Sequence, residues 1–293
     1  MPGPFTAALD ELHTSGRPYW GPHNFQDYLK KHGLKADTAR SISVDAHEDL
    51  DRELRERQTM VLRMGNHHGR GTSFVLVRCD SVRSQFYLED AAFSRVPAQV
   101  KTQHVGAAQL APFQVLPQFS EYALLSLVIA SGALGEALGL ENSRILPASG
   151  HFTADFAVKP LAAEPQIFSH QQGQVEVDAL FYGVRDGRPL LVVVESKRDG
   201  GLRSLAKHKL VYPLLALAPK VDPSIRLLPV YVRLRLQPPS GLGLVVELDL
   251  MECAFPENGA LEELQPVRIL RHVVHLDGLP REPKWRKYQF RRE

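Results

Sequence analysis

The 293-residue sequence has only two cysteines, Cys79 and Cys253, and they lie far apart. This number and spacing argue against a disulfide framework and against a zinc site. No apolar run reaches the roughly 18 residues that a membrane-spanning helix needs, and the N-terminus lacks the charged and apolar segments of a signal peptide. The sequence therefore predicts a globular, cytoplasmic protein that contacts no membrane.

The chain also lacks a large net charge: its formal net charge is only +2. The bases are nevertheless unevenly distributed. Residues 195–235 contain nine Lys or Arg against three acids, and residues 281–293 contain six against two. A basic C-terminal half of this kind favours a polyanionic partner, with an ordinary solvated surface as the alternative.

The order of the predicted elements divides the chain into two domains. Residues 1–115 begin with a loose lead-in over 1–22 and continue with short helices and with strands, including 84–88, on either side of a glycine-rich turn, which predicts an α+β domain. Residues 116–293 predict an α/β or α+β domain, in which a central mixed sheet is flanked by helices. Its elements run helix, three strands, helix and two strands, at 119–140, 152–158, 175–182, 190–195, 202–217, 227–236 and 243–250.

A β-hairpin in the second domain brings acids together. Asp186-Gly187 is a strong signal for a two-residue hairpin turn. With that turn, Asp178 lies opposite Glu195 with their Cα atoms about 4.5–5.5 Å apart. Lys197 is two residues beyond Glu195 and shares its face of the sheet. Pro189 cannot donate a ladder hydrogen bond, so a shift of the register at this residue is the alternative.

This arrangement of charges suits metal-assisted hydrolysis of a phosphodiester. Opposed carboxylates repel each other unless a cation lies between them. Lys197 supplies one positive charge, and Mg²⁺, which binds one or two carboxylates together with waters and phosphate oxygens, would supply more. The alternative is an exposed sheet face with an unremarkable Lys–Glu pair. The apolar run from Leu190 to Val194 favours an interior strand and hence the functional interpretation.

These residues resemble the motif of the PD-(D/E)XK nuclease superfamily. Asp178 matches the first acid, although Val177 replaces the proline before it, and Glu195-Ser196-Lys197 matches E-x-K. The α-β-β-β-α-β order of residues 119–236 is also similar to the core of that superfamily. The resemblance implies a restriction-endonuclease-like fold and a Mg²⁺-dependent DNA endonuclease of the restriction type, with Mn²⁺ as a substitute metal.

The same resemblance assigns roles to individual residues. Asp178, Glu195 and Lys197 would be catalytic, and Asp178 and Glu195 would bind the metal. Some members add an acid from the first core helix, for which Glu121 is the candidate; a first-turn Glu that stabilises the helix dipole is the alternative. The segment His208–Tyr212 is similar to the Q-x-x-x-Y helix of some branches, with His208 in place of Gln.

The resemblance also implies double-stranded DNA as the partner and a homodimer as the cutting unit. The N-terminal domain would recognise the DNA. The predicted DNA-binding residues are Arg198, Arg203, Lys207 and His208 after the motif, and His67, His68 and Arg70 at the glycine-rich turn. A solvated helix face for Lys207 and His208, and a flexible hairpin tip for the turn, are the alternatives. Two further functions stay open: a repair or recombination nuclease that selects DNA structure, and a non-catalytic module that binds nucleic acid.

Overall fold

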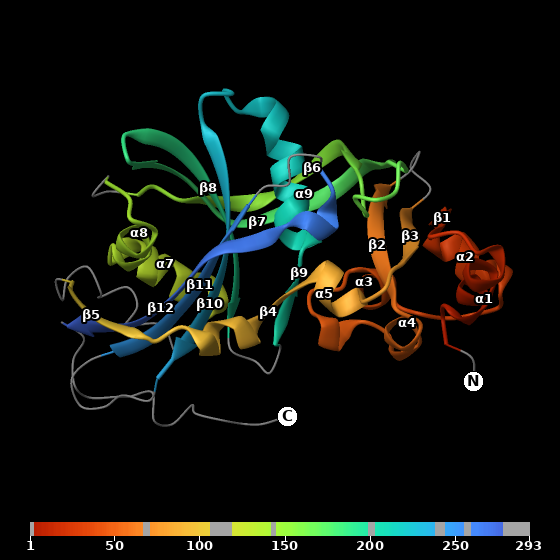
Figure 1. Ribbon diagram of the computed structural model, residues 1–293, viewed down its shortest axis with the longest axis horizontal. Coiled ribbons are helices and arrows are strands. Elements are labelled where there is room, and N and C mark those ends of the chain that lie inside the picture. Colours follow the sequence, from red (N-terminus) through yellow and green to blue (C-terminus); the bar gives the residue numbers. More distant parts are fainter. Residues whose placement is uncertain are drawn as a thin grey trace.

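The computed structural model describes residues 3–66, 71–105, 119–141, 145–198, 203–237, 244–254 and 259–277. The fold is mixed α+β, and a large mixed sheet flanked by helices forms its centre (Figure 1). This confirms the predicted class and the predicted mixed sheet. Among the described residues, no helix combines the length and the apolar character that are needed to cross a membrane.

Ten strands of the described chain form the main sheet, whose path runs β1-β3-β2-β7-β8-β10-β11-β12-β5, with β6 paired to β7. Neighbouring strands are parallel in the pairs β2/β7, β8/β10 and β12/β5 and antiparallel elsewhere. The strands are β1 (Tyr19–Asn24), β2 (Thr59–Asn66), β3 (Thr72–Arg78), β5 (Gln99–His104), β6 (Ala148–Val158), β7 (Phe168–Arg185), β8 (Arg188–Arg198), β10 (Arg226–Leu236), β11 (Leu244–Ala254) and β12 (Gln265–Asp277). A separate pair consists of β4 (Tyr87–Glu89) and β9 (Ser204–Ala206).

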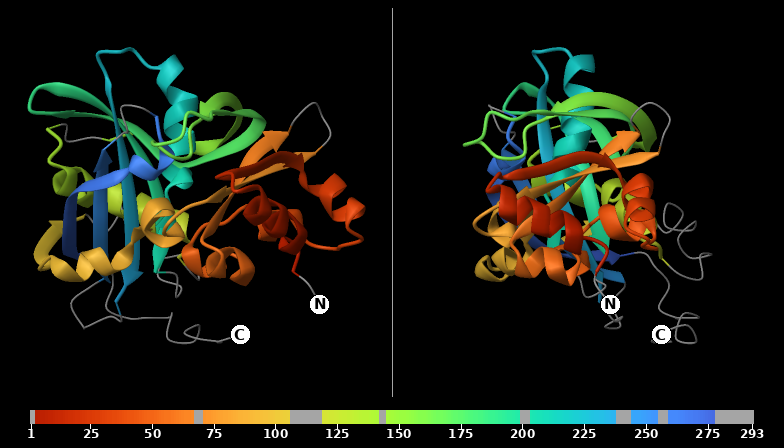
Figure 2. Two further views of the ribbon diagram at one scale, coloured as in Figure 1. Left: turned by 45° about the vertical axis from the view of Figure 1, so that its right-hand side comes forward. Right: turned by 90° about the vertical axis from the view of Figure 1, so that its right-hand side faces the viewer.

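Helices cover both faces of the central strands (Figure 2). The N-terminal part contributes α1 (Thr6–Ser15), α2 (Phe25–Lys31), α3 (Thr38–Ile42), α4 (Arg52–Glu56), α5 (Val82–Phe86) and the 3-10 turns η1 (His47–Asp49) and η3 (Asp90–Arg95). The rest contributes α7 (Glu121–Ala130), α8 (Ala133–Leu138), α9 (His208–Leu217), η4 (Ala218–Lys220) and η5 (Leu261–Glu263). The α7 and α8 helices pack against Val192 and Val194, and α9 packs against Val193 on the opposite face.

The helix predicted over 119–140 is divided into α7 and α8. Ser120 caps α7 by accepting a hydrogen bond from the Ala123 N–H. Gly132 has φ +81°, a left-handed conformation that ends one helix before the next begins. Both helices are apolar on most sides, and their buried residues belong to one cluster with those of the strands. The order of elements over 119–236 otherwise follows the prediction, with the short strand β9 inserted before α9.

Two short segments of the N-terminal part differ from the prediction. Part of the expected lead-in over 1–22 is the helix α1, whose Ala8, Leu9 and Leu12 are buried. The strand expected at 84–88 is mostly the helix α5, because the Ser81 hydroxyl accepts a hydrogen bond from the Ser84 N–H and caps it.

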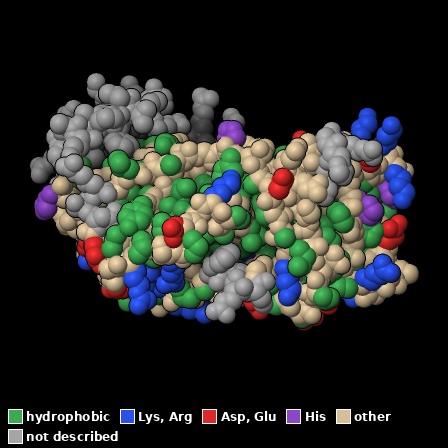
Figure 3. Space-filling model, turned by 90° about the horizontal axis from the view of Figure 1, so that it is seen from above, with side chains coloured by type: hydrophobic (Ala, Val, Ile, Leu, Met, Phe, Trp, Pro, Cys, Tyr) green, Lys and Arg blue, Asp and Glu red, His purple; other side chains and the backbone are tan. Residues whose placement is uncertain are grey.

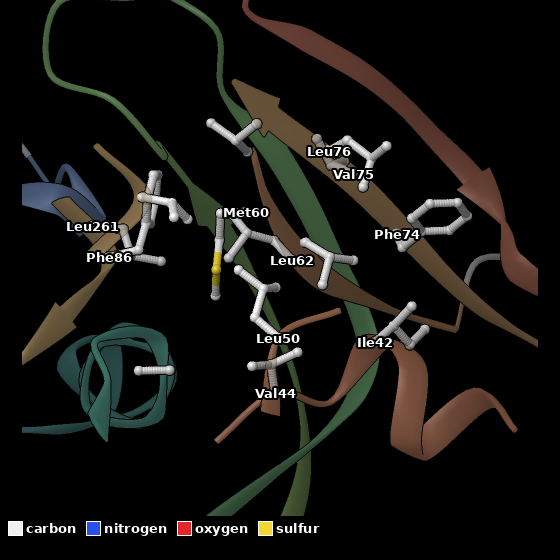
Figure 4. Packing of buried hydrophobic residues seen from close by; sticks show 14 of the residues in the cluster. Ile42, Val44, Leu50, Met60, Leu62, Phe74, Val75, Leu76, Phe86 and Leu261 are labelled. Carbon is white, nitrogen blue, oxygen red and sulfur yellow. The ribbon is translucent and has the colours of Figure 1, made fainter. Parts of the chain in front are cut away.

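One hydrophobic cluster joins residues from both predicted domains. Phe74 and Phe86 of the N-terminal part belong to it, and so do Leu210, Tyr231 and Leu261. Figure 4 shows Leu261 and Phe86 beside Met60 of β2. The predicted boundary at 115/116 lies outside the described residues, and the division into two domains stays a prediction.

Candidate active site at the end of strand β8

The hairpin of β7 and β8 has the predicted register. Arg185 lies opposite Arg188, and the antiparallel ladder continues to Ala179 opposite Val194. Pro189 faces Val184 within this ladder without shifting it. Asp186 and Gly187 both have positive φ, as the two-residue turn requires. The hairpin therefore brings Asp178 next to the end of β8, where Glu195 and Lys197 lie.

Asp178 lies at a β-bulge. On the β6 side, Gly150 pairs with Val177 and Ala148 pairs with Leu180, so β7 has one residue more than β6 in this interval. The packing changes at the same place: Val177 belongs to the cluster that contacts α9, whereas Ala179 belongs to the cluster that contacts α7. Because bulges re-aim side chains, Asp178 is not paired with Glu195 as predicted: the ladder ends at Ala179 and Val194, and the Asp178 carboxylate contacts Ser196.

The Asp178 carboxylate contacts the residue between Glu195 and Lys197. Its Oδ2 accepts hydrogen bonds from the Ser196 N–H at 2.6 Å and from the Ser196 hydroxyl at 3.2 Å. From α7, Glu121 Oε2 accepts a hydrogen bond from the Arg198 N–H at 2.7 Å. Burial raises the pKa of Glu121, and the nearby Asp178 carboxylate acts in the same direction. The structure thus brings two of the predicted acids, Asp178 and Glu121, to the backbone of one strand end.

Glu195 belongs to a network of four charged side chains on the α9 side. It is 2% exposed, and its Oε1 lies 2.9 Å from Lys197 Nζ and 3.6 Å from Lys209 Nζ. The Asp45 carboxylate contacts the same two ammonium groups, with Oδ2 3.4 Å from Lys197 Nζ and Oδ1 3.3 Å from Lys209 Nζ. Two acids and two bases therefore alternate around a largely buried centre.

The electrostatics of the network follow from burial and from these contacts. Burial, and to a smaller extent the Asp178 charge, raise the pKa of Glu195 to about 7 against the opposing effect of Lys209 and Lys197. Burial alone would lower the pKa of Lys197, but Glu195 and Asp45 outweigh it and raise that pKa. Lys197 is therefore held in its charged form, while the Glu195 carboxyl titrates near neutral pH.

Two members of the network, Asp45 and Lys209, were not identified as site residues in the sequence. Lys209 lies in the first turn of α9, where it is the one Lys or Arg in an otherwise apolar helix, and this is a signal that the sequence does offer. Asp45 comes from the loop after α3, and its carbonyl accepts a hydrogen bond from the Ala206 N–H at 2.8 Å. No local pattern connects it to residues 150 positions later.

Two of the predicted DNA-binding residues, Lys207 and His208, are buried, and their role in DNA binding stays a prediction. Lys207 is 1% exposed, and its Nζ donates a hydrogen bond to the Glu262 carbonyl. His208 is 7% exposed, and burial together with Lys209 lowers its pKa to about 3, so the ring is neutral. Neither side chain lies on the exposed surface, although His208 lines a pocket. Arg198 and Arg203 are exposed, as a contact with phosphate requires.

The remaining DNA-binding candidates, His67, His68 and Arg70, lie outside the described residues, and so does the basic segment 281–293. On the described part of the face in Figure 3, Lys and Arg side chains are scattered among hydrophobic ones and do not form a continuous stripe. The predicted polyanion-binding surface therefore stays a prediction.

The donor set at the strand end is compatible with a cation that uses few protein ligands. Among the described residues, no group of three His, Cys, Asp or Glu side chains is arranged to hold a metal ion. The Asp178 carboxylate contacts Ser196 and the Glu195 carboxylate contacts Lys197, so two acids lie at one strand end. Mg²⁺ typically takes one or two carboxylates and completes its shell with water and phosphate oxygens, so this pair fits Mg²⁺ better than it fits a cation that needs an all-protein site.

Comparison with known proteins gives one match. Neither the curated proteins nor the solved structures contain a match to this chain. The model of a family described as a domain of unknown function, DUF6997, matches residues 89–268, more than half of the 293-residue chain. The matched span contains α7, the β7–β8 hairpin and α9, and thus all of the site except Asp45. The chain therefore belongs to the DUF6997 family.

Proposed function

We propose that this protein is a Mg²⁺-dependent DNA endonuclease of the restriction type, with its active site at the end of β8. One observation carries the proposal: the Asp178 carboxylate of β7 is bonded to Ser196, the residue between Glu195 and Lys197. An acid on one strand is thereby fixed against the acid-x-lysine of the next. This juxtaposition is the one that the resemblance to PD-(D/E)XK nucleases implies for Asp178, Glu195 and Lys197.

The order and burial of the elements support the same proposal. Apart from the short elements α8, β9 and η4, the series α7, β6, β7, β8, α9, β10 follows the α-β-β-β-α-β order of that superfamily. Glu195 is almost completely buried and has a strongly raised pKa, although a solvent-exposed glutamate would cost the fold less. Buried charges with perturbed pKa values are concentrated at functional sites, although structural ion networks also produce them.

Asp178 and Glu195 are the residues that would hold the metal, and Glu121 would support it from α7. When bound, Mg²⁺ would stabilise negative charge on the phosphate and lower the pKa of an attacking water. Asp178 Oδ2 accepts its hydrogen bonds from Ser196, and Glu195 Oε1 lies near the two lysines.

Lys197 would act as a charged hydrogen-bond donor. Its ammonium stays protonated because Glu195 and Asp45 raise its pKa. It can therefore orient a water molecule or a phosphate oxygen and stabilise the charge that develops in the transition state. A role for Lys197 as the general base does not agree with this environment. Lys209, which contacts the same two carboxylates, keeps Glu195 in position beside it.

The decisive experiment is cleavage of plasmid and linear phage DNA with Mg²⁺, with Mn²⁺ and with EDTA, followed by sequencing of the ends. Asp178→Asn, Glu195→Gln and Lys197→Met are each expected to lower the cleavage rate by at least about 10²-fold, as loss of a transition-state contact does. The exposed residues Glu56 and Lys35 provide matched controls as Glu56→Gln and Lys35→Met. Full activity in any of the three site variants would refute the assignment.

The same experiment separates the two other functions. A repair or recombination nuclease would leave intact duplexes uncut and cleave flaps, junctions or single strands. A non-catalytic module would bind DNA without cutting any of these substrates. A restriction-type enzyme would cut duplexes at a fixed sequence. We further propose that it acts as a homodimer, because cutting both strands requires two active sites; the mass of the DNA-bound protein in ultracentrifugation tests this.

A further inference from the structure

A pocket of about 550 Å³ lies between the N-terminal part and α9, next to the candidate active site. Its walls come from α3, β2, β7 and α9, and they include Arg40, Arg63, His170, His208, Lys209 and Tyr212. Asp45 and Lys209 line it as well as contacting Glu195 or Lys197, so the pocket is continuous with the charged network. Pockets of this size hold ligands of the size of a nucleotide.

Arg63 gives the pocket an unsatisfied positive charge. Its Nη1 donates a hydrogen bond to the Ser43 hydroxyl at 3.2 Å, while its buried Nε has no hydrogen-bond partner. Within the described residues, no carboxylate lies at ion-pair distance from Arg63, although fifteen such ion pairs exist elsewhere in that part of the chain. A guanidinium is charged at every physiological pH, and its planar donors match phosphate oxygens.

The acids at the pocket do not neutralise this charge. Asp45 already contacts Lys197 and Lys209. Asp49 and Glu176 are exposed at the rim, where water solvates them. Arg40 is also exposed there and adds a second guanidinium. The inner part of the pocket is therefore electropositive beside Arg63.

A second residue of the pocket lining, His208, also has a polar atom without a partner within the described chain. His208 lines the pocket with only 7% of its surface exposed, and its Nδ1 is buried without a hydrogen-bond partner among the described residues. The neutral ring can either donate or accept a hydrogen bond there. Next to it lie the Tyr212 ring, at 5.3 Å between centroids, and the His170 ring, which stacks on Phe156 at 4.2 Å. The Tyr212 ring is tilted by 53° to the His208 ring and by 60° to the His170 ring, and the three rings together form the ring wall of the pocket.

We propose that this pocket is a phosphate-binding subsite, which holds one nucleotide of the DNA beside the cleaved bond with Arg63 as its principal ligand. The inference rests on the proposed function, because it takes the network of Glu195 and Lys197 as the cleavage site. Arg63 would bind the phosphate, Arg40 would assist from the rim, and the ring wall would accept the sugar and base. The phosphate belongs either to the interior of a strand or to a strand end.

Calorimetric titrations in EDTA test the subsite without cleavage. The probes are thymidine 5′-monophosphate for a strand end, the dinucleotide TpT for an internal phosphodiester, and thymidine as the control without phosphate. One of the two phosphate probes is expected to bind at least about tenfold more tightly than thymidine, as charge-assisted hydrogen bonds to phosphate do. The tighter of the two identifies the source of the phosphate. Equal affinity of all three probes would overturn the proposal.

Substitutions assign the binding to Arg63. Arg63→Gln is expected to lower the affinity for the phosphate probe at least about tenfold. Arg57→Gln removes an arginine that is paired with Asp10 at 2.6 Å, and it is expected to leave the affinity unchanged. Unchanged affinity in folded Arg63→Gln would overturn the proposal. If that variant does not fold, Arg40→Gln decides, with an expected loss of roughly two- to fivefold for a rim charge and with unchanged affinity as the contradicting result.

The subsite and the proposed function fail in different ways. Binding that depends on Arg63, without cleavage of any DNA, would reject the nuclease and keep the phosphate site. Cleavage that depends on Glu195 and Lys197, with no effect of Arg63 on probe affinity, would keep the nuclease and reject the subsite.

Discussion

Asp178 accepts a hydrogen bond from the Ser196 N–H across the β7–β8 hairpin, with 2.6 Å between donor and acceptor. Ser196 is 1% exposed, so water cannot replace this acceptor. The contact fixes the bulged residue Asp178 beside Glu195 and Lys197. Because a carboxylate and an amide can both accept this bond, substitution can separate the structural role of Asp178 from its chemical role.

Asp178→Ala is expected to lower the free energy of unfolding by about 1–3 kcal/mol, because it leaves a buried N–H without an acceptor. Asp178→Asn keeps an acceptor oxygen and is expected to cost less than about 1 kcal/mol. Both variants should lose cleavage, since neither has the negative charge. Urea unfolding and the cleavage assay measure the two effects. Equal stability of the two variants would show that the contact with Ser196 does not hold the strand end.

Lys209 should contribute more to stability than an ordinary surface lysine does. Lys209→Met leaves the buried Glu195 with Lys197 alone, and we expect the free energy of unfolding to fall by about 1–3 kcal/mol, less than the roughly 3–5 kcal/mol for a buried charge that loses every partner. Lys101→Met is the control, since Lys101 forms an exposed pair with Glu136 at 2.9 Å; such pairs contribute about 0–1 kcal/mol. Urea unfolding compares them, and equal losses would contradict a buried network.

Local features of the sequence predicted the hairpin correctly. The Asp186-Gly187 turn fixes the register through Ala179 and Val194, because a two-residue loop leaves no freedom in how its strands pair. The apolar run before Glu195 likewise identified a strand whose central part, Val192 to Ser196, is buried. Both results depend only on neighbours in the sequence.

Non-local contacts account for what the sequence could not predict. The bulge at Asp178 arises from pairing with β6, which no property of the hairpin specifies. The Asp45 carbonyl accepts a hydrogen bond from the Ala206 N–H, which holds Asp45 near Lys209. Ala206 in turn belongs to the small sheet of β4 and β9. Lysine is usually a surface residue. Lys207, in the turn before α9, is instead buried, and its Nζ donates a hydrogen bond to the carbonyl of Glu262 in η5.

Gly65 forms the pairing between β2 and β7, where a side chain would collide with the backbone of Gln171. It pairs with Gln171, has φ +77°, and a Cβ at this position would meet the Gln171 carbonyl oxygen at 2.2 Å. Gly65→Ala is expected to lower the free energy of unfolding by roughly 2–4 kcal/mol, from strain and overpacking together. Gly16→Ala, with φ +65° and nothing within 4 Å, isolates the strain at about 1–2 kcal/mol. Thermal or urea unfolding gives both values, and equal losses would refute the close approach of β2 and β7.

Lys207 gives a pH-dependent prediction whose sign follows from its burial. Burial lowers the pKa of Lys207 from 10.5 to about 8, against the opposing effect of Glu262 and Cys253. The folded state therefore binds fewer protons than the unfolded state between these two pKa values, and stability rises with pH in that interval. The cost of the buried charge is complete below about pH 8 and declines as the pH approaches 10.5.

Lys207→Met removes this titration and keeps most of the side-chain volume. We expect the stability of the wild type, measured against Lys207→Met, to increase by about 2 kcal/mol between pH 7 and pH 9.5. Urea unfolding at the two pH values measures the difference, and other titrating groups cancel because both proteins contain them. DNA affinity should be unchanged in the variant, since Lys207 Nζ is bonded to the Glu262 carbonyl. A difference that is independent of pH, or a loss of DNA affinity, would show that Lys207 is exposed and charged in solution.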